Sequence, residues 1–143
     1  MNRAKAAKLL MTFVLLAISI VSFVLDWRSN HLLSPEWHPH AKFHDALLLF
    51  TLAGVALTGV WLLWRKSKEP QVAFIVAALL ALSYCTPPFY ITSVLPGSSL
   101  WAGKVGGELH LFGRVFYPNL AVAALAIILT LTAYWMSRTA PEE

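Results

Sequence analysis

Charged residues are scarce in this chain, and their scarcity excludes a soluble domain. Only 13% of its 143 residues are charged, whereas 58% are hydrophobic. An ordinary soluble domain carries about 25% charged residues, which cover its surface. The apolar residues are gathered into long uncharged runs, so the solvent that matches this composition is the hydrocarbon of a lipid bilayer.

Cysteine is almost absent as well. Cys85 is the single cysteine, so neither an intramolecular disulfide nor a CxxC redox motif can form. This excludes the thiol–quinone oxidoreductases that also use small four-helix bundles. Cys85 lies in an apolar run with no basic neighbour in sequence, and we expect it to be a buried structural residue and not a nucleophile.

Long apolar runs predict the fold. A spanning helix needs about 20 mostly apolar residues. Four uncharged runs reach or approach this length: Leu9–Leu25, Ala46–Trp64, Pro70–Gly103 and Val115–Ser137. We therefore predict an all-α fold, a single integral membrane domain over residues 1–143 that forms a bundle of four transmembrane helices. Its expected spans are residues 7–26, 45–64, 71–92 and 116–137.

The first run follows a basic leader, as a secretory signal does. The residues after it are Asp26, Trp27 and Arg28, which offer no pair of small residues for cleavage. We therefore expect this segment to be retained as a membrane anchor.

The basic residues explain the net charge of +4 without a nucleic-acid partner, because their positions follow the topology. Seven lie at the ends of the chain or between the second and third spans: Arg3, Lys5, Lys8, Arg65, Lys66, Lys68 and Arg138. Four lie in the other two loops: Arg28, Lys42, Lys104 and Arg114. Since Lys and Arg accumulate in cytoplasmic segments, both termini are expected in the cytoplasm. The other two loops are expected to be irregular and extracytoplasmic. The host membrane is expected to be an inner or plasma membrane.

The third run contains Thr86, Pro87 and Pro88. Proline removes a backbone hydrogen bond and clashes with the preceding turn, so a straight helix is not expected here. We predict a kink or an early helix end near Thr86. This break has two interpretations, an ordinary proline kink or an opening onto a cavity.

The five histidines all lie outside the apolar runs: His31, His38, His40, His44 and His110. If Pro39 is the first residue of the second helix, His40 and His44 are four residues apart and share one face. Two imidazoles are an incomplete zinc site, so other donors must join them. We expect His40 and His44 to point toward the bundle axis, His31 to fold back toward them, and His110 or Glu108 to approach from the second outer loop. The predicted metal ligands for a divalent ion such as zinc are His31, His40, His44 and His110. The predicted acid–base residues are His40, His44, Asp45 and Glu108.

The same stretch resembles a signature of small four-span membrane proteins that are mostly uncharacterised. The resemblance rests on Asn30-His31, Pro35-Glu36-Trp37 and Pro39-His40-Ala41-Lys42-Phe43-His44. The positions of this chain that match the signature include His31, His40, His44, Trp37 and Phe43. Ser34 and His38 depart from the signature, which has Asn and Pro there, so His38 is the histidine least expected to take part. The resemblance implies no established activity.

The sequence is compatible with two functions. One is a metal or acid–base centre that acts on a lipid-soluble small molecule such as an isoprenoid or quinone. The other is a non-catalytic membrane subunit, a small-molecule binder or a homo-oligomer, in which the outer loops dock a partner and the histidines merely mark the lipid–water interface. A haem cytochrome and a transporter fit less well, because no span holds a histidine or a central charge.

The topology is directly testable. A reporter fused after Glu143 is expected to read cytoplasmic, and one inserted near Gly106 to read extracytoplasmic, because of the distribution of Lys and Arg. Fusions of alkaline phosphatase and green fluorescent protein report the two sides. The reverse pattern would contradict the assignment and move every histidine to the cytoplasmic side.

Overall fold

The computed structural model describes residues 2–101 and 108–139. Its long helices are α1 (Arg3–Asp26), α2 (Pro39–Trp64), α3 (Pro70–Cys85) and α5 (Pro118–Arg138). Its short elements are the 3-10 turn η1 (Pro87–Phe89), α4 (Ile91–Val94), β1 (His110–Leu111) and β2 (Arg114–Val115). Within the described residues four helical segments are long and apolar enough to cross a membrane, with the third extending through η1 to Phe89. The predicted four-span helical architecture is confirmed.

Proline marks the start of three of the helices. Pro39, Pro70 and Pro118 are the first residues of α2, α3 and α5, where a missing N–H is harmless and the fixed φ suits the helix. The predicted first position of Pro39 is therefore confirmed. The remaining long helix, α1, begins without a proline. Its N-cap is Asn2, whose side chain accepts a hydrogen bond from the Ala4 amide at 2.8 Å.

The predicted break in the third span is present. α3 ends at Cys85, and the chain continues through Thr86 into η1. The Thr86 hydroxyl donates to the Leu82 carbonyl at 2.8 Å, and the Ser83 hydroxyl donates to the Leu80 carbonyl at 2.8 Å. Both side-chain hydrogen bonds therefore lie in the last turns of α3, just before the proline pair.

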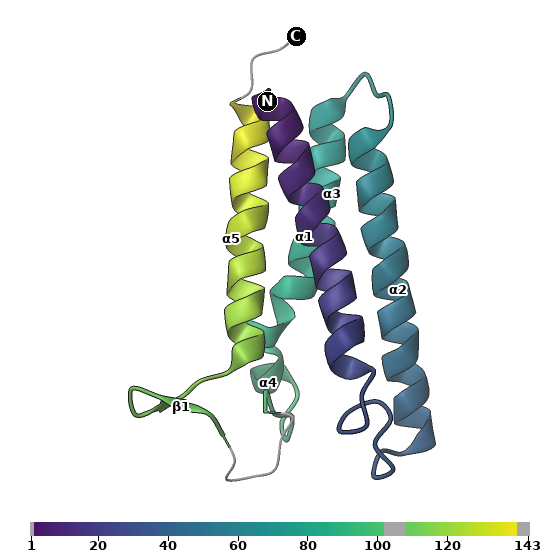
Figure 1. Cartoon of the computed structure of the whole chain (residues 1–143), viewed down its shortest axis with the longest axis vertical. Helices are drawn as coiled ribbons and strands as arrows, with labels where there is room; N and C mark the ends of the chain where they lie inside the picture. Colours follow the sequence, from purple (N-terminus) through teal and green to yellow (C-terminus); the bar gives the residue numbers. More distant parts are fainter. Residues whose placement is uncertain (1, 102–107, 140–143) are drawn as a thin grey trace.

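The four long helices form a ring in which each contacts its two neighbours, in the order α1, α2, α3, α5. α1 also contacts α3 across the ring. The start of α1, the end of α5 and the α2–α3 loop lie at one end of the bundle, called here the terminal end (Figure 1). The α1–α2 loop and the short elements between α3 and α5 lie at the opposite end, called here the histidine end.

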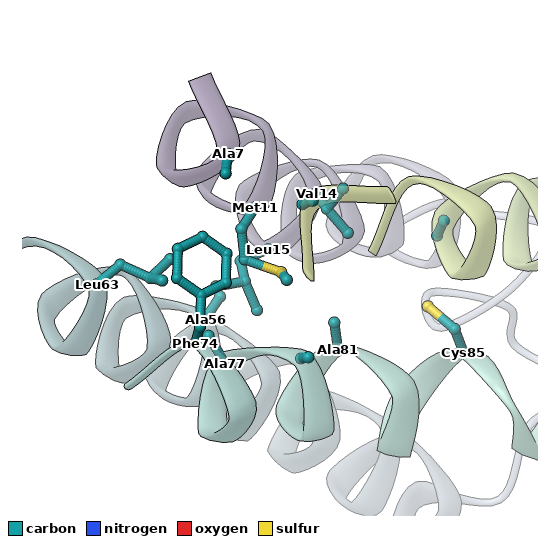
Figure 2. Close-up of a cluster of buried hydrophobic side chains, with 13 residues drawn as sticks. Ala7, Met11, Val14, Leu15, Ala56, Leu63, Phe74, Ala77, Ala81 and Cys85 are labelled. Carbon is teal, nitrogen blue, oxygen red and sulfur yellow. The ribbon is translucent and has the colours of Figure 1, made fainter. Parts of the chain in front are cut away.

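Small residues fill the centre of the bundle. Met11 and Leu15 of α1 lie close to Phe74 of α3 and Ala56 of α2 in one buried cluster (Figure 2). The remaining buried positions of α3 and α5 are mostly alanine: Ala73, Ala77, Ala78, Ala81, Ala123, Ala126 and Ala133. Such residues let helix backbones approach closely, which is how helices associate in lipid, where apolar burial gives no driving force. Cys85 is buried in the same cluster, as expected.

Large apolar side chains point outward. Phe13, Phe50, Leu57, Leu79 and Ile128 are each about 60% exposed along the helices. An exposed apolar surface of this extent is unfavourable in water and is the surface that hydrocarbon solvates. The chain is therefore an integral membrane protein.

Gly59 of α2 packs directly against the end of the buried Leu15 side chain of α1. A Cβ atom at this position would lie 2.8 Å from Leu15 Cδ1, whereas a Cβ atom at Gly54 meets nothing within 4 Å. We expect Gly59→Val to lower the free energy of unfolding by about 1–3 kcal/mol through overpacking. Reversible unfolding in detergent, followed by circular dichroism, measures this. Gly54→Val is the matched control, and equal losses for both variants would contradict the proposed contact.

Candidate functional site

The inward-facing row of α1 ends in a carboxylate. Met11, Leu15 and Ser22 are buried along this row, and Asp26 follows Ser22 at a spacing of four residues. Because residues four apart share a helix face, Asp26 is positioned at the mouth of the bundle. Its side chain is 28% exposed.

The inward-facing row of α2 begins with the second carboxylate. Its buried positions are Leu49, Leu52, Ala56, Gly59 and Leu63. Asp45 precedes Leu49 by one helical turn, so it extends the same row toward the histidine end. Its side chain is 16% exposed.

The α1–α2 loop folds back over the helix ends and places a histidine between the two acids. The Asp26 carbonyl accepts hydrogen bonds from the amides of Arg28 and Leu32 at 2.8 and 3.0 Å. Leu32 is only 3% exposed and anchors the loop on the bundle. His31 therefore sits at the mouth, and its ring packs against Trp37 with 4.7 Å between ring centroids.

These three residues, His31, Asp26 and Asp45, form what we call the mouth cluster. His31 Nδ1 lies 3.7 Å from Asp26 Oδ1 and 3.8 Å from Asp45 Oδ2. Both distances suit an ion pair and exceed a hydrogen bond. In the described part of the chain, His31 Nδ1 and Asp45 Oδ2 are solvent-inaccessible and have no hydrogen-bond partner. Such unpaired buried groups cost free energy and are uncommon in native proteins.

A polar contact continues from the mouth cluster into the bundle. The Tyr84 hydroxyl of α3 lies 2.6 Å from the Ser22 hydroxyl of α1. Because Tyr84 comes just before the break at Thr86, the end of α3 brings this hydroxyl to the depth of the acids.

His40 and His44 form a separate pair. Their Nε2 atoms lie 2.9 Å apart, and their rings meet edge to face at 4.4 Å. Both side chains are exposed, which corrects the expectation that they point toward the bundle axis. The physical reason is the direction of each side chain around the helix axis. The buried row of α2 extends through Asp45, and the side chain of His44, one residue earlier, points about 100° away from that row.

In the described part of the chain, His110 and Glu108 lie apart from both groups, in or next to the β1–β2 hairpin. His110 lies in β1, where its Nδ1 is 2.9 Å from the backbone carbonyl oxygen of Glu108. The β1–β2 hairpin and the α1–α2 loop lie on opposite sides of the histidine end (Figure 1). The expected convergence on His110 or Glu108 is therefore replaced by convergence of His31 on Asp26 and Asp45.

The donor sets do not fit a metal ion. Among residues 2–101 and 108–139, no group of three or more His, Cys, Asp or Glu side chains has the geometry to hold one. The pair of His40 and His44 supplies two donors, one fewer than the three protein ligands of a catalytic zinc.

His38 has a local role that the sequence did not indicate. Its Nδ1 accepts a hydrogen bond from the His40 amide at 3.2 Å, which makes it the N-cap of α2. The signal that was available is its position before Pro39, where helices favour a side-chain acceptor. The contact between Ser22 and Tyr84 was also missed, because the residues are 62 positions apart.

The mouth cluster is testable as a coupled unit. We expect His31→Gln and Asp45→Asn each to destabilise the protein and to be non-additive by about 1 kcal/mol, since the two side chains interact directly. A double-mutant cycle of unfolding in detergent measures the coupling. His110→Gln combined with Asp45→Asn is the control, expected to be additive within about 0.5 kcal/mol. Additive effects for His31 as well would contradict the assigned contact.

Comparisons with known proteins give the chain a family but no activity. A family model described as a family of unknown function, DUF6640, matches residues 11–139. The search of curated proteins found no match. The search of solved structures likewise found none. The match covers most of α1, all of α2, α3 and α5, and the whole mouth cluster, so the chain belongs to DUF6640, a family of unknown function.

Proposed function

We propose that this protein carries an acid–base centre, formed by His31, Asp26 and Asp45, that acts on a lipid-soluble small molecule at the membrane surface. The centre lies at the histidine end, which the distribution of Lys and Arg favours as the extracytoplasmic side. Both termini then lie in the cytoplasm, and the host is an inner or plasma membrane.

The position of His31 Nδ1 is the observation that supports this proposal. Histidine is the side chain whose charge ordinarily changes between about pH 5 and 8. Two carboxylate oxygens lie within 3.8 Å of this one ring nitrogen, and they favour one orientation of the ring. The other nitrogen, Nε2, is then the one left to exchange a proton with a substrate, as in carboxylate–histidine pairs of hydrolases.

The surroundings favour a ligand that arrives from lipid. The cavity beside Tyr84, between α1, α2 and α3, has a volume of about 10 Å³, which is room for about one water molecule. A substrate therefore reaches the cluster at the mouth and not through the bundle.

An aromatic surface stands next to Asp26 at the lipid-facing side. Phe23 and Trp27 of the α1 end stack with 6.1 Å between ring centroids, and Phe50 of α2 meets Phe23 edge to face at 5.4 Å. Trp27 and Phe50 are 44% and 62% exposed. Aromatic faces of this kind bind flat or unsaturated apolar groups, which fits an isoprenoid or quinone-like substrate.

A second function, docking of a partner membrane protein, is favoured by the β1–β2 hairpin. Phe112 at its tip is 96% exposed and has φ +51°, beside Gly113 at φ +76°. Leu109 and Leu111 are half exposed nearby. A bulky side chain held at positive φ and fully exposed is unfavourable for an isolated chain, and burial against a partner would offset this cost.

The two functions are separated by comparing variants in host membranes. Lipid extracts of membranes with the wild type, analysed by mass spectrometry, are expected to show turnover of a lipid-soluble compound. His31→Gln is expected to reduce this turnover by about 10²–10⁴-fold, the usual contribution of an acid–base group. The variant His40→Gln/His44→Gln is the matched control and is expected to keep at least half of the turnover.

The docking function gives the opposite pattern. It predicts a co-purifying membrane protein that Phe112→Ser releases and His31→Gln retains. Lipid extracts that are identical for the wild type and His31→Gln, together with such a partner, would overturn the acid–base proposal.

A further inference from the structure

The terminal end of the bundle contains a basic cavity that the proposed function does not use. It has a volume of about 320 Å³ and lies between α1, the end of α2 and the start of α3. Three cationic side chains line it: Lys8 from α1, and Arg65 and Lys66 from the α2–α3 loop. The hydroxyl residue Ser67 lines it too, and none of its described lining residues is acidic.

In the described part of the chain, no acidic side chain forms an ion pair with any of the three cations. Among the described residues, the ion pairs are confined to His31 with Asp26 and Asp45, at the other end of the bundle. Lys8 is half-buried, which makes an uncompensated charge there more costly than one in bulk water. A phosphate anion bound among the three side chains would offset this cost.

The floor and wall of the cavity are apolar. Leu62, Leu63 and Ala73 line it from α2 and α3, and the indole of Trp64 stands beside Lys8 Nζ at 5.9 Å from the ring centroid. The Trp64 indole N–H donates to the Thr12 hydroxyl at 2.9 Å, which fixes this wall between α2 and α1. Tryptophan at a helix end marks the depth of lipid headgroups.

We propose that this cavity binds the phosphate group of an anionic phospholipid, with the glycerol and upper acyl region against its apolar floor. Arg65 supplies the planar donor fork that matches phosphate oxygens, and Lys8 and Lys66 supply point charges. Basic cavities between spanning helices on the cytoplasmic side favour anionic headgroups, in agreement with the proposed orientation. The inference is independent of the acid–base centre.

The test is native mass spectrometry of the detergent-purified full chain titrated with phosphatidylglycerol or phosphatidylcholine. The wild type is expected to bind phosphatidylglycerol at least about tenfold more tightly than phosphatidylcholine. The variant Lys8→Gln/Arg65→Gln/Lys66→Gln is expected to lose this preference. The control Lys5→Gln/Lys68→Gln/Arg138→Gln removes the same charge from the same end without touching the cavity lining, and is expected to keep it.

A second variant guards against misfolding. Arg65→Gln/Lys66→Gln alters only exposed side chains, and it is expected to lower phosphatidylglycerol affinity while leaving the circular dichroism spectrum and unfolding temperature unchanged. Equal losses in the cavity and control triples would overturn the proposal, because they would indicate a general charge effect. Binding of inorganic phosphate without selective binding of phosphatidylglycerol would overturn the assignment to a lipid.

Discussion

One electrostatic constraint organises the histidine end of this protein: two carboxylates face each other at the mouth of the bundle. Asp26 ends the inward row of α1, and Asp45 begins the inward row of α2. Two negative charges at such a site repel each other, and their partial burial strengthens the repulsion. His31 Nδ1 lies within 3.8 Å of both, so the imidazole stands beside the two acids and connects the α1–α2 loop to both helices.

The rest of the bundle determines where those carboxylates sit. Alanine along α3 and α5 and Gly59 against Leu15 let the helices approach closely, which fixes their rotation about their own axes. The break after Cys85 ends α3 at the depth where Tyr84 meets Ser22. A slip of α2 by one residue would replace Asp45 with a neighbour and leave His31 without its second acid.

Much of this fold follows from the sequence because lipid permits few alternatives. Long apolar runs require helices, since backbone groups must bond within the segment, and the prolines at 39, 70 and 118 mark the starts. The face of α2 that is buried could not be predicted from the sequence. Its residues are apolar on every face, so no polar face opposes the buried one. The spacing of Ala56 and Gly59 relative to Asp45 was the available signal, because small residues mark helix contacts in membranes. The meeting of Ser22 with Tyr84 depends on helix order, which the sequence does not encode locally.

The most direct measurement of the central claim is a solid-state NMR distance experiment on the protein in bilayers. Asp26 and Asp45 are the only aspartates in the sequence, so ¹³C labelling of aspartate carboxyls and ¹⁵N labelling of histidine rings isolates the contact. The account predicts that one histidine nitrogen is strongly dephased by carboxyl carbons and that His31→Gln removes this signal, whereas His40→Gln/His44→Gln does not. Absence of dephasing, or its persistence in His31→Gln, would contradict the account.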